Sequence, residues 1–174
     1  MTLWDFAVAF YDQPGVAPAC LGLQDRCDAD VVGLMFAAWT GFELGVRMTP
    51  EDFAQARRHV QAWRDHVVIP LRQVRREMKG KALSSFHPSS SPLRDKLKAL
   101  ELEAEKLQLE ALEGWAATRF PGNAAQASAT LGLDNMGAFL QEQMNMTEYG
   151  AQSAISRELV DGLRRLEVGA SKPI

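Results

Sequence analysis

Two long stretches of apolar residues at helical spacing constrain this chain more than any other feature. Apolar side chains recur every three or four positions over residues 53–78, and a similar stripe runs over residues 93–111. One face of an α-helix repeats with this period. We therefore expect one helix over about 50–79, kinked at Pro70, or two helices that meet near Ile69. Another long helix should begin at 93 and end near 120. Two helices of similar length joined by a short loop favour an antiparallel hairpin, with the two stripes either facing each other along its seam or shared with the N-terminal helices.

The first quarter of the chain supplies the bulk for a hydrophobic core. The spacing predicts a helix over 3–11, a second over 16–27 after a Pro-Gly break, and a third over 31–45 that is apolar almost throughout. Asp30 is the expected N-cap of the third helix. The third run contains Glu43 and is shorter than the roughly 20 apolar residues that cross a bilayer. It is predicted to be a buried helix, without membrane insertion.

The last third of the chain carries weaker helical patterns. They predict a short helix capped by Asp134 and a final amphipathic helix from Ile155 to Leu166, and no alternating pattern is long enough for a strand. The predicted fold class is all-α, a single-domain helical bundle built on the long antiparallel hairpin with three shorter N-terminal helices. The domain spans residues 1–168, with a serine- and proline-rich loop at 81–92 and a frayed tail at 169–174.

Length and composition exclude several classes of protein. A chain of 174 residues with 47% hydrophobic and 24% charged residues suits one soluble domain. The net charge of -3 does not favour DNA binding. No signal-peptide pattern occurs at the N-terminus, so a cytoplasmic location is expected. Cys20 and Cys27 are seven positions apart on a predicted helix, too far for a disulfide, and are expected to be free.

No group of residues has the spacing of a catalytic or metal site. His59 and His66 are seven positions apart on one helix, and His87 lacks the frame of a serine hydrolase. Asp25 and Asp28 share a helix end and weakly resemble a magnesium or diphosphate site. The sequence therefore favours a binding protein over an enzyme, with no cofactor and no metal.

A basic group near the end of the helix over 50–79 is the main candidate binding surface. Such a group is typical either of a solvated helix end paired with Glu101, Glu103 or Glu105, or of a patch that binds anions or an acidic protein surface. The leading hypothesis is a helical accessory protein that binds a macromolecular partner, a protein rather than DNA, through this helix end and the adjoining loop. The basic residues are Arg72, Arg75, Arg76 and Lys79.

The alternative hypothesis is a binder or enzyme for a small molecule such as a lipid, an isoprenoid diphosphate or a nucleotide. Its apolar pocket would lie between the N-terminal helices and the hairpin, closed by arginine or by a magnesium-binding aspartate. Asp25, Trp4 and Trp39 are its candidate binding residues. Asp5 or Asp25 is also expected to pair with an arginine of the hairpin. The leucine face over 93–111 suits either the core or a dimer seam, and the oligomeric state stays open.

Several segments form one specific combination: Leu3-Trp4-Asp5-Phe6-Ala7, Tyr11, Pro14-Gly15-Val16, Ala19-Cys20-Leu21, Leu23-Gln24-Asp25, Asp30-Val31, Val68, Pro70-Leu71-Arg72 and Val74-Arg75-Arg76. This combination resembles a family of short proteobacterial proteins known only as a domain of unknown function. The resemblance covers roughly residues 3–115. It implies a helical, cytoplasmic protein and brings no reaction or cofactor with it. Cys27-Asp28 departs from the histidine-glycine pair expected there, which weakens a ligand role for that corner.

Overall fold

The computed structural model describes residues 1–79, 90–122, 126–144, 150 and 154–170, and every regular element in these ranges is helical. The elements are α1 (Leu3–Tyr11), α2 (Val16–Cys27), α3 (Val31–Phe42), α4 (Pro50–Trp63), the π-helical turn η1 (Arg64–Val68), α5 (Ile69–Glu77), α7 (Ser90–Arg119), α8 (Ala129–Met144) and α10 (Arg157–Ala170). The predicted all-α, single-domain bundle is confirmed.

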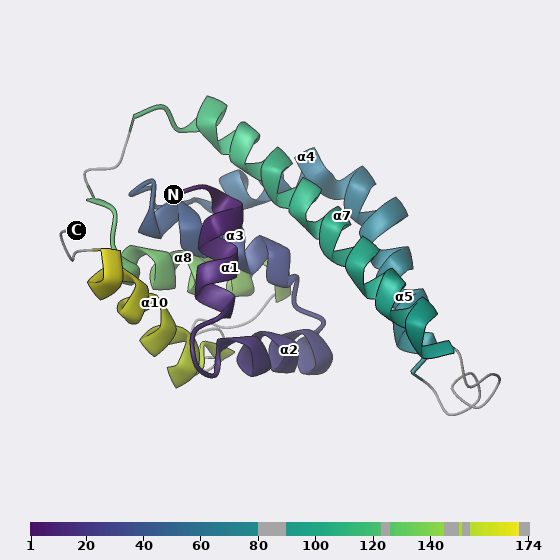
Figure 1. Ribbon diagram of the computed structural model, residues 1–174. Helices are drawn as coiled ribbons and strands as arrows, with labels where there is room; N and C mark the ends of the chain where they lie inside the picture. Colours follow the sequence, from purple (N-terminus) through teal and green to yellow (C-terminus); the bar gives the residue numbers. More distant parts are fainter. Residues whose placement is uncertain (80–89, 123–125, 145–149, 151–153, 171–174) are drawn as a thin grey trace.

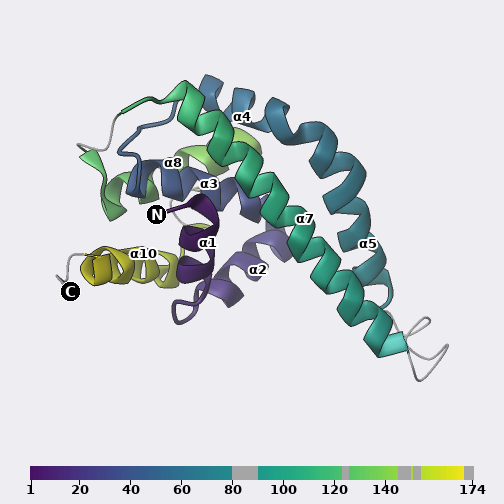
Figure 2. The same cartoon turned by 45° about the horizontal axis from the view of Figure 1, so that its top comes forward.

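A long helical hairpin forms one side of the molecule. Helix α4, η1 and α5 follow one another without a break, and α7 runs back along them (Figures 1 and 2). At the start of α4 the Thr49 hydroxyl accepts from the Asp52 N–H while the Asp52 carboxylate accepts from the Thr49 N–H. This capping box satisfies two backbone donors that a helix start leaves unpaired. Because α7 runs back along α4, η1 and α5, the predicted antiparallel hairpin is confirmed.

The helix over 50–79 does not keep its phase, because η1 inserts one extra residue. The Ile69 N–H bonds to the Arg64 carbonyl, a step of five residues in place of four, immediately before Pro70. One added residue turns everything that follows by about 100° round the axis. The face that packs inward thus changes from Phe53 and Val60 in α4 to Val68 at the end of η1 and to positions 72 and 75 in α5.

This rotation corrects the predicted seam of the hairpin. Val74 lies on the predicted stripe but is 46% exposed, and α5 has no buried residue. On α7, Leu93, Leu100 and Leu107 are 56%, 50% and 47% exposed, whereas Ala104 is buried. The two helices do lie side by side, but these leucines face solvent because charged residues of α5 occupy the interface beside them.

The core centres on α3, which α1, α7 and α8 contact. Helix α3 is buried over most of its length, as its apolar run predicts. It approaches α8 closely at glycines: a Cβ on Gly41 would lie 2.5 Å from backbone atoms of Leu131 and Gly132. Likewise a Cβ on Gly33 would lie 2.4 Å from the ring of Phe139. The two helices can therefore pack this tightly only where side chains are absent.

Several predicted boundaries need correction. Helix α3 ends at Phe42 and not at residue 45. Helix α8 begins at Ala129, five positions before the predicted cap; the Ser128 hydroxyl accepts from the Leu131 N–H, while Asp134 bonds Arg47. Helix α7 begins at Ser90, so residues 90–92 of the predicted loop form its first turn. The rest of that loop lies outside the described residues, and α10 continues to residue 170, into the predicted tail.

Other predictions for the fold are confirmed. Asp30 caps α3 by accepting from the N–H groups of Val32 and Gly33. Cys20 and Cys27 are free, and burial raises the pKa of the Cys20 thiol to about 12. Among the described residues, no helix combines the length and the apolar character needed to span a bilayer.

A pair of glycine substitutions tests the packing of α3 on α8. Gly41→Ala should lower the free energy of unfolding by about 1–3 kcal/mol, because its Cβ would meet backbone that cannot move aside. Gly114→Ala, in an open position of α7, should instead raise it by about 0.5–1 kcal/mol through the higher helix propensity of alanine. Urea unfolding followed by circular dichroism measures both. Equal effects of the two substitutions would contradict the close approach of the helices.

Candidate functional site

The basic residues at the end of the hairpin are largely paired within the fold. Arg72 bonds the carboxylates of both Glu101 and Glu105, and Arg75 bonds Glu101 through two of its nitrogens. The side chains of Arg72 and Glu101 are only 13% and 7% exposed. These four residues, which we call the ion cluster, lie between α5 and α7. Pairing with Glu101 and Glu105 was one of the alternatives predicted for this group, and it is confirmed.

Burial and charge act in opposite directions on the two glutamates. Burial alone would raise the pKa of Glu101, but the hydrogen bonds and charges of Arg75 and Arg72 outweigh it and lower that pKa. For Glu105 burial dominates, and its pKa is raised despite the charge of Arg72. Glu101 is therefore the carboxylate on which the cluster depends.

The remaining members of the predicted basic surface lie closer to solvent. Arg76 bonds the Asp25 carboxylate at 3.0 Å and the Gln24 amide oxygen at 3.3 Å, which confirms the predicted link between the N-terminal helices and the hairpin. Asp5 instead accepts from the hydroxyl of Thr2. Lys79 is exposed just beyond α5. The exposed Arg76–Asp25 pair contributes little stability, about 0–1 kcal/mol.

The two predicted tryptophans lie apart from this surface. Trp39 is buried in the core, and its indole N–H donates to the Met1 carbonyl at 3.1 Å. Trp4 is partly buried on α1, and the Lys106 amine lies 5.3 Å from the centre of its ring. Neither lines the pocket described next, nor do the other predicted binding residues.

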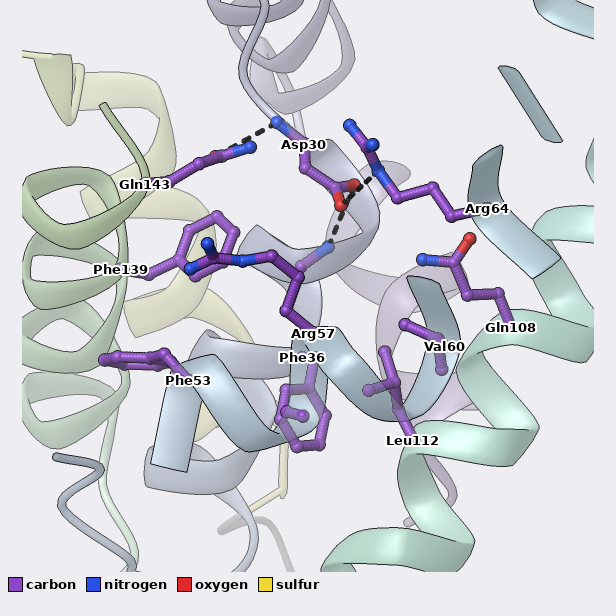
Figure 3. Close-up of a pocket in the computed structure, with 12 residues that line it drawn as sticks. Asp30, Phe36, Phe53, Arg57, Val60, Arg64, Gln108, Leu112, Phe139 and Gln143 are labelled. Atoms are coloured by element: carbon purple, nitrogen blue, oxygen red, sulfur yellow. Dashed lines mark hydrogen bonds and ion pairs between the residues drawn. The ribbon is translucent and has the colours of Figure 1, made fainter. Parts of the chain in front are cut away.

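A pocket of about 190 Å³ lies where α3, α4, α7 and α8 meet (Figure 3). Its apolar wall comes from Phe36 of α3, Phe53 and Val60 of α4, Leu112 of α7 and Phe139 of α8. The missing Cβ of Gly33 leaves room for the Phe139 ring. The close packing of α3 on α8 thus positions this aromatic wall.

The opposite wall of the pocket is polar. The Asp30 carboxylate accepts from Arg64 Nε at 3.0 Å, and the Asp30 N–H donates to the Gln143 amide oxygen at 3.2 Å (Figure 3). Arg64 also bonds Asp65, and Arg57 pairs with Glu142. Because each arginine is matched by a carboxylate, this wall offers directed hydrogen bonds and carries little net charge.

Gln108 differs from the other polar residues of the pocket. Gln108 is 1% exposed, and its side chain extends from α7 toward the pocket beside Arg64 (Figure 3). Among the residues that the structure describes, neither its amide oxygen nor its nitrogen has a hydrogen-bond partner. Buried amides in native proteins are nearly always bonded, because leaving one unpaired costs about 1–3 kcal/mol. The pocket therefore presents one unused donor and one unused acceptor side by side.

Sequence reasoning missed most of this pocket, although two signals were present. Gln108 interrupts the buried face of α7 between Ala104 and Leu112, where an apolar residue would be expected. Arg57 and Arg64 flank Val60 on the inward side of the helix. No group of three or more histidine, cysteine or acidic side chains gathers as a metal site in the described part of the chain.

Substitution of the two glutamates tests the ion cluster. Glu101→Gln should lower the free energy of unfolding at pH 7 by about 3 kcal/mol, because it leaves two arginines in the interface without their shared carboxylate. Glu105→Gln should lower the free energy of unfolding less, since burial already disfavours the ionised form of Glu105. Urea unfolding at neutral pH checks the order.

The pH dependence of the same variants gives a second readout. The lowered pKa of Glu101 means that its contribution is present above the ordinary value of 4.5 and is lost as the pH falls. Glu101→Gln should therefore lose less stability on acidification than the wild type does. The same acid dependence in both proteins would show that Glu101 is not the carboxylate concerned.

Comparison with known proteins places the chain in a family. Residues 2–112 match the model of a family described as Protein of unknown function (DUF2390). The matched region contains α1 to α5 and most of α7. It includes the ion cluster and ten of the twelve residues that line the pocket, from Asp30 to Leu112. No curated protein and no solved structure matched. The chain belongs to this family of proteins of unknown function.

Proposed function

We propose that the protein binds a small molecule in the pocket between α3, α4, α7 and α8. The observation that carries this proposal is the buried, unpartnered amide of Gln108 at the edge of an aromatic cavity. A bound molecule with an adjacent donor and acceptor would satisfy both of its polar atoms. Three phenylalanines and two aliphatic side chains would cover the apolar part of the same molecule.

The size of the pocket favours a compact ligand. A dry cavity of about 150 Å³ is known to hold benzene in another protein. The 190 Å³ here suits one ring with a polar substituent and is small for a whole lipid or isoprenoid chain. The ligand chemistry that fits is a carboxamide, a lactam or a carboxylic acid on a ring.

The charges of the pocket favour a neutral or singly charged ligand. Arg57 and Arg64 are each held by carboxylates, so neither is free to balance a diphosphate. The leading sequence hypothesis, a macromolecular partner at the basic helix end, has less support from the geometry because Arg72 and Arg75 are engaged in the ion cluster. An enzymatic reaction has no supporting group of residues in this pocket.

Binding of simple probes tests the proposal. Benzamide offers a donor and an acceptor, whereas acetophenone offers only the acceptor, and saturation-transfer NMR with a thermal-shift assay detects either. Benzamide should bind and raise the melting temperature, and acetophenone should bind more weakly. Gln108→Met should abolish the preference for benzamide, while Gln61→Met on the exposed face of α4 should leave it unchanged. Failure of both probes, or equal binding by Gln108→Met, would contradict the proposal.

The stability of the same variant gives an independent prediction. Gln108→Met keeps the side-chain volume and removes a buried amide without partners, so it should raise the free energy of unfolding by about 1 kcal/mol. A functional residue that opposes stability is expected at a binding site. Urea unfolding without ligand measures the change. A clear loss of stability would mean that Gln108 already makes structural hydrogen bonds.

A further inference from the structure

A row of leucines lies on the solvent face of α7. Leu93, Leu100 and Leu107 are spaced by seven positions, and each is about half exposed. A spacing of seven keeps side chains on one stripe of a helix, as in a coiled coil. Single exposed leucines are common on proteins, but an aligned row marks a surface that another apolar surface can cover. Trp63, 39% exposed and bonded to the Ala104 carbonyl, extends the apolar area beside the row.

Charged residues border the row with the same spacing. Lys96, Glu103 and Glu110 are exposed and follow the leucines along one edge. Within the described residues Lys96 has no ionic partner, and Glu110 has only a long contact of 3.9 Å with Lys106. Gly114 continues the row of leucines, and no atom of the described residues lies within 4 Å of where its Cβ would be. The charged edge is therefore positive at its Lys96 end and negative at its Glu110 end.

We propose that this face of α7 binds the same face of a second copy of the chain, with the two helices antiparallel. A two-fold axis beside Glu103 would place Leu100 against the partner's Leu107, because these positions are centred within one residue of 103. The same axis places Lys96 beside the partner's Glu110, and the reverse. It also places Leu93 over the open space at the partner's Gly114.

Charge complementarity argues for a second copy in this orientation. The antiparallel pair forms two lysine–glutamate contacts at its ends, against one contact between the two Glu103 side chains at its centre. In a parallel two-fold pair the charged edges of the two helices lie on opposite sides of the contact and do not meet. Only the antiparallel arrangement brings Lys96 of one copy beside Glu110 of the other, so the edge is complementary to itself in that orientation alone. The seam is separate from the pocket and does not rest on ligand binding.

The oligomeric state in solution tests this proposal. Sedimentation velocity of the full chain over a range of concentrations should show a monomer–dimer equilibrium. The double substitution Leu100→Asp and Leu107→Asp should weaken dimerisation at least tenfold. Leu102→Asp is the matched control: Leu102 is 53% exposed but lies about 200° round the helix from Leu100, so the dimer should persist. Circular dichroism confirms that each variant is folded.

Charge exchange separates a specific seam from general stickiness. Lys96→Glu and Glu110→Lys should each weaken the dimer severalfold, and the double variant should restore it, because the paired charges have only changed places. Added salt should reduce the difference between the single variants and the wild type. A monomer at every concentration, an equal effect of Leu102→Asp, or no rescue by the double variant would overturn the proposal.

Discussion

The close approach of α3 to α8 is the contact on which the rest of the bundle depends. At Gly33, Gly41 and Gly132 the helices leave no room for a β-carbon: backbone of the partner helix lies against Gly41 and Gly132, and the ring of Phe139 lies against Gly33. The approach sets the position of the Phe139 ring and thereby one wall of the pocket. The same α8 carries Asn135, whose buried amide bonds Thr40, Val46 and Met48 and fixes the segment that leads into α4. Core and pocket are therefore parts of one arrangement.

The hairpin reverses the usual distribution of polar and apolar residues. Its outer half, formed by α5 and the first half of α7, extends beyond the other helices, with the ion cluster between the two helices and leucines on the surface (Figures 1 and 2). Buried ion pairs contribute less to net stability than apolar packing of similar volume, but they specify which surfaces can meet. We interpret the cluster as the device that fixes the hairpin and leaves the leucines available.

The sequence predicted the elements of this fold better than their orientation. Local spacing was sufficient for the helices and the hairpin, and Asp25 could be matched to an arginine because both interrupt apolar surroundings. The exposure of Val74 and Leu100 could not be predicted. It follows from the π-helical turn, which leaves the spacing of apolar residues in the sequence unchanged but rotates the residues after it about the helix axis. The pocket is formed by residues of α3, α4, α7 and α8, which are distant in the sequence. A local pattern cannot predict that Gln108 lies beside residues of the other helices without a hydrogen-bond partner among the described residues.

The π-helical turn has a consequence for how this surface is specified. One surplus residue ahead of Pro70 decides whether α5 shows its arginines or its valine and leucine to α7, although the composition of the helix would be the same in either case. The chemical character of the wall that α5 turns toward α7 is therefore set by the hydrogen-bond step of one turn and not by the composition of α5. Deleting one residue of η1 would restore the four-residue step and keep the arginines indoors, whereas winding the same residues into a regular α-helix would swing α5 by about 100° and carry them away from α7.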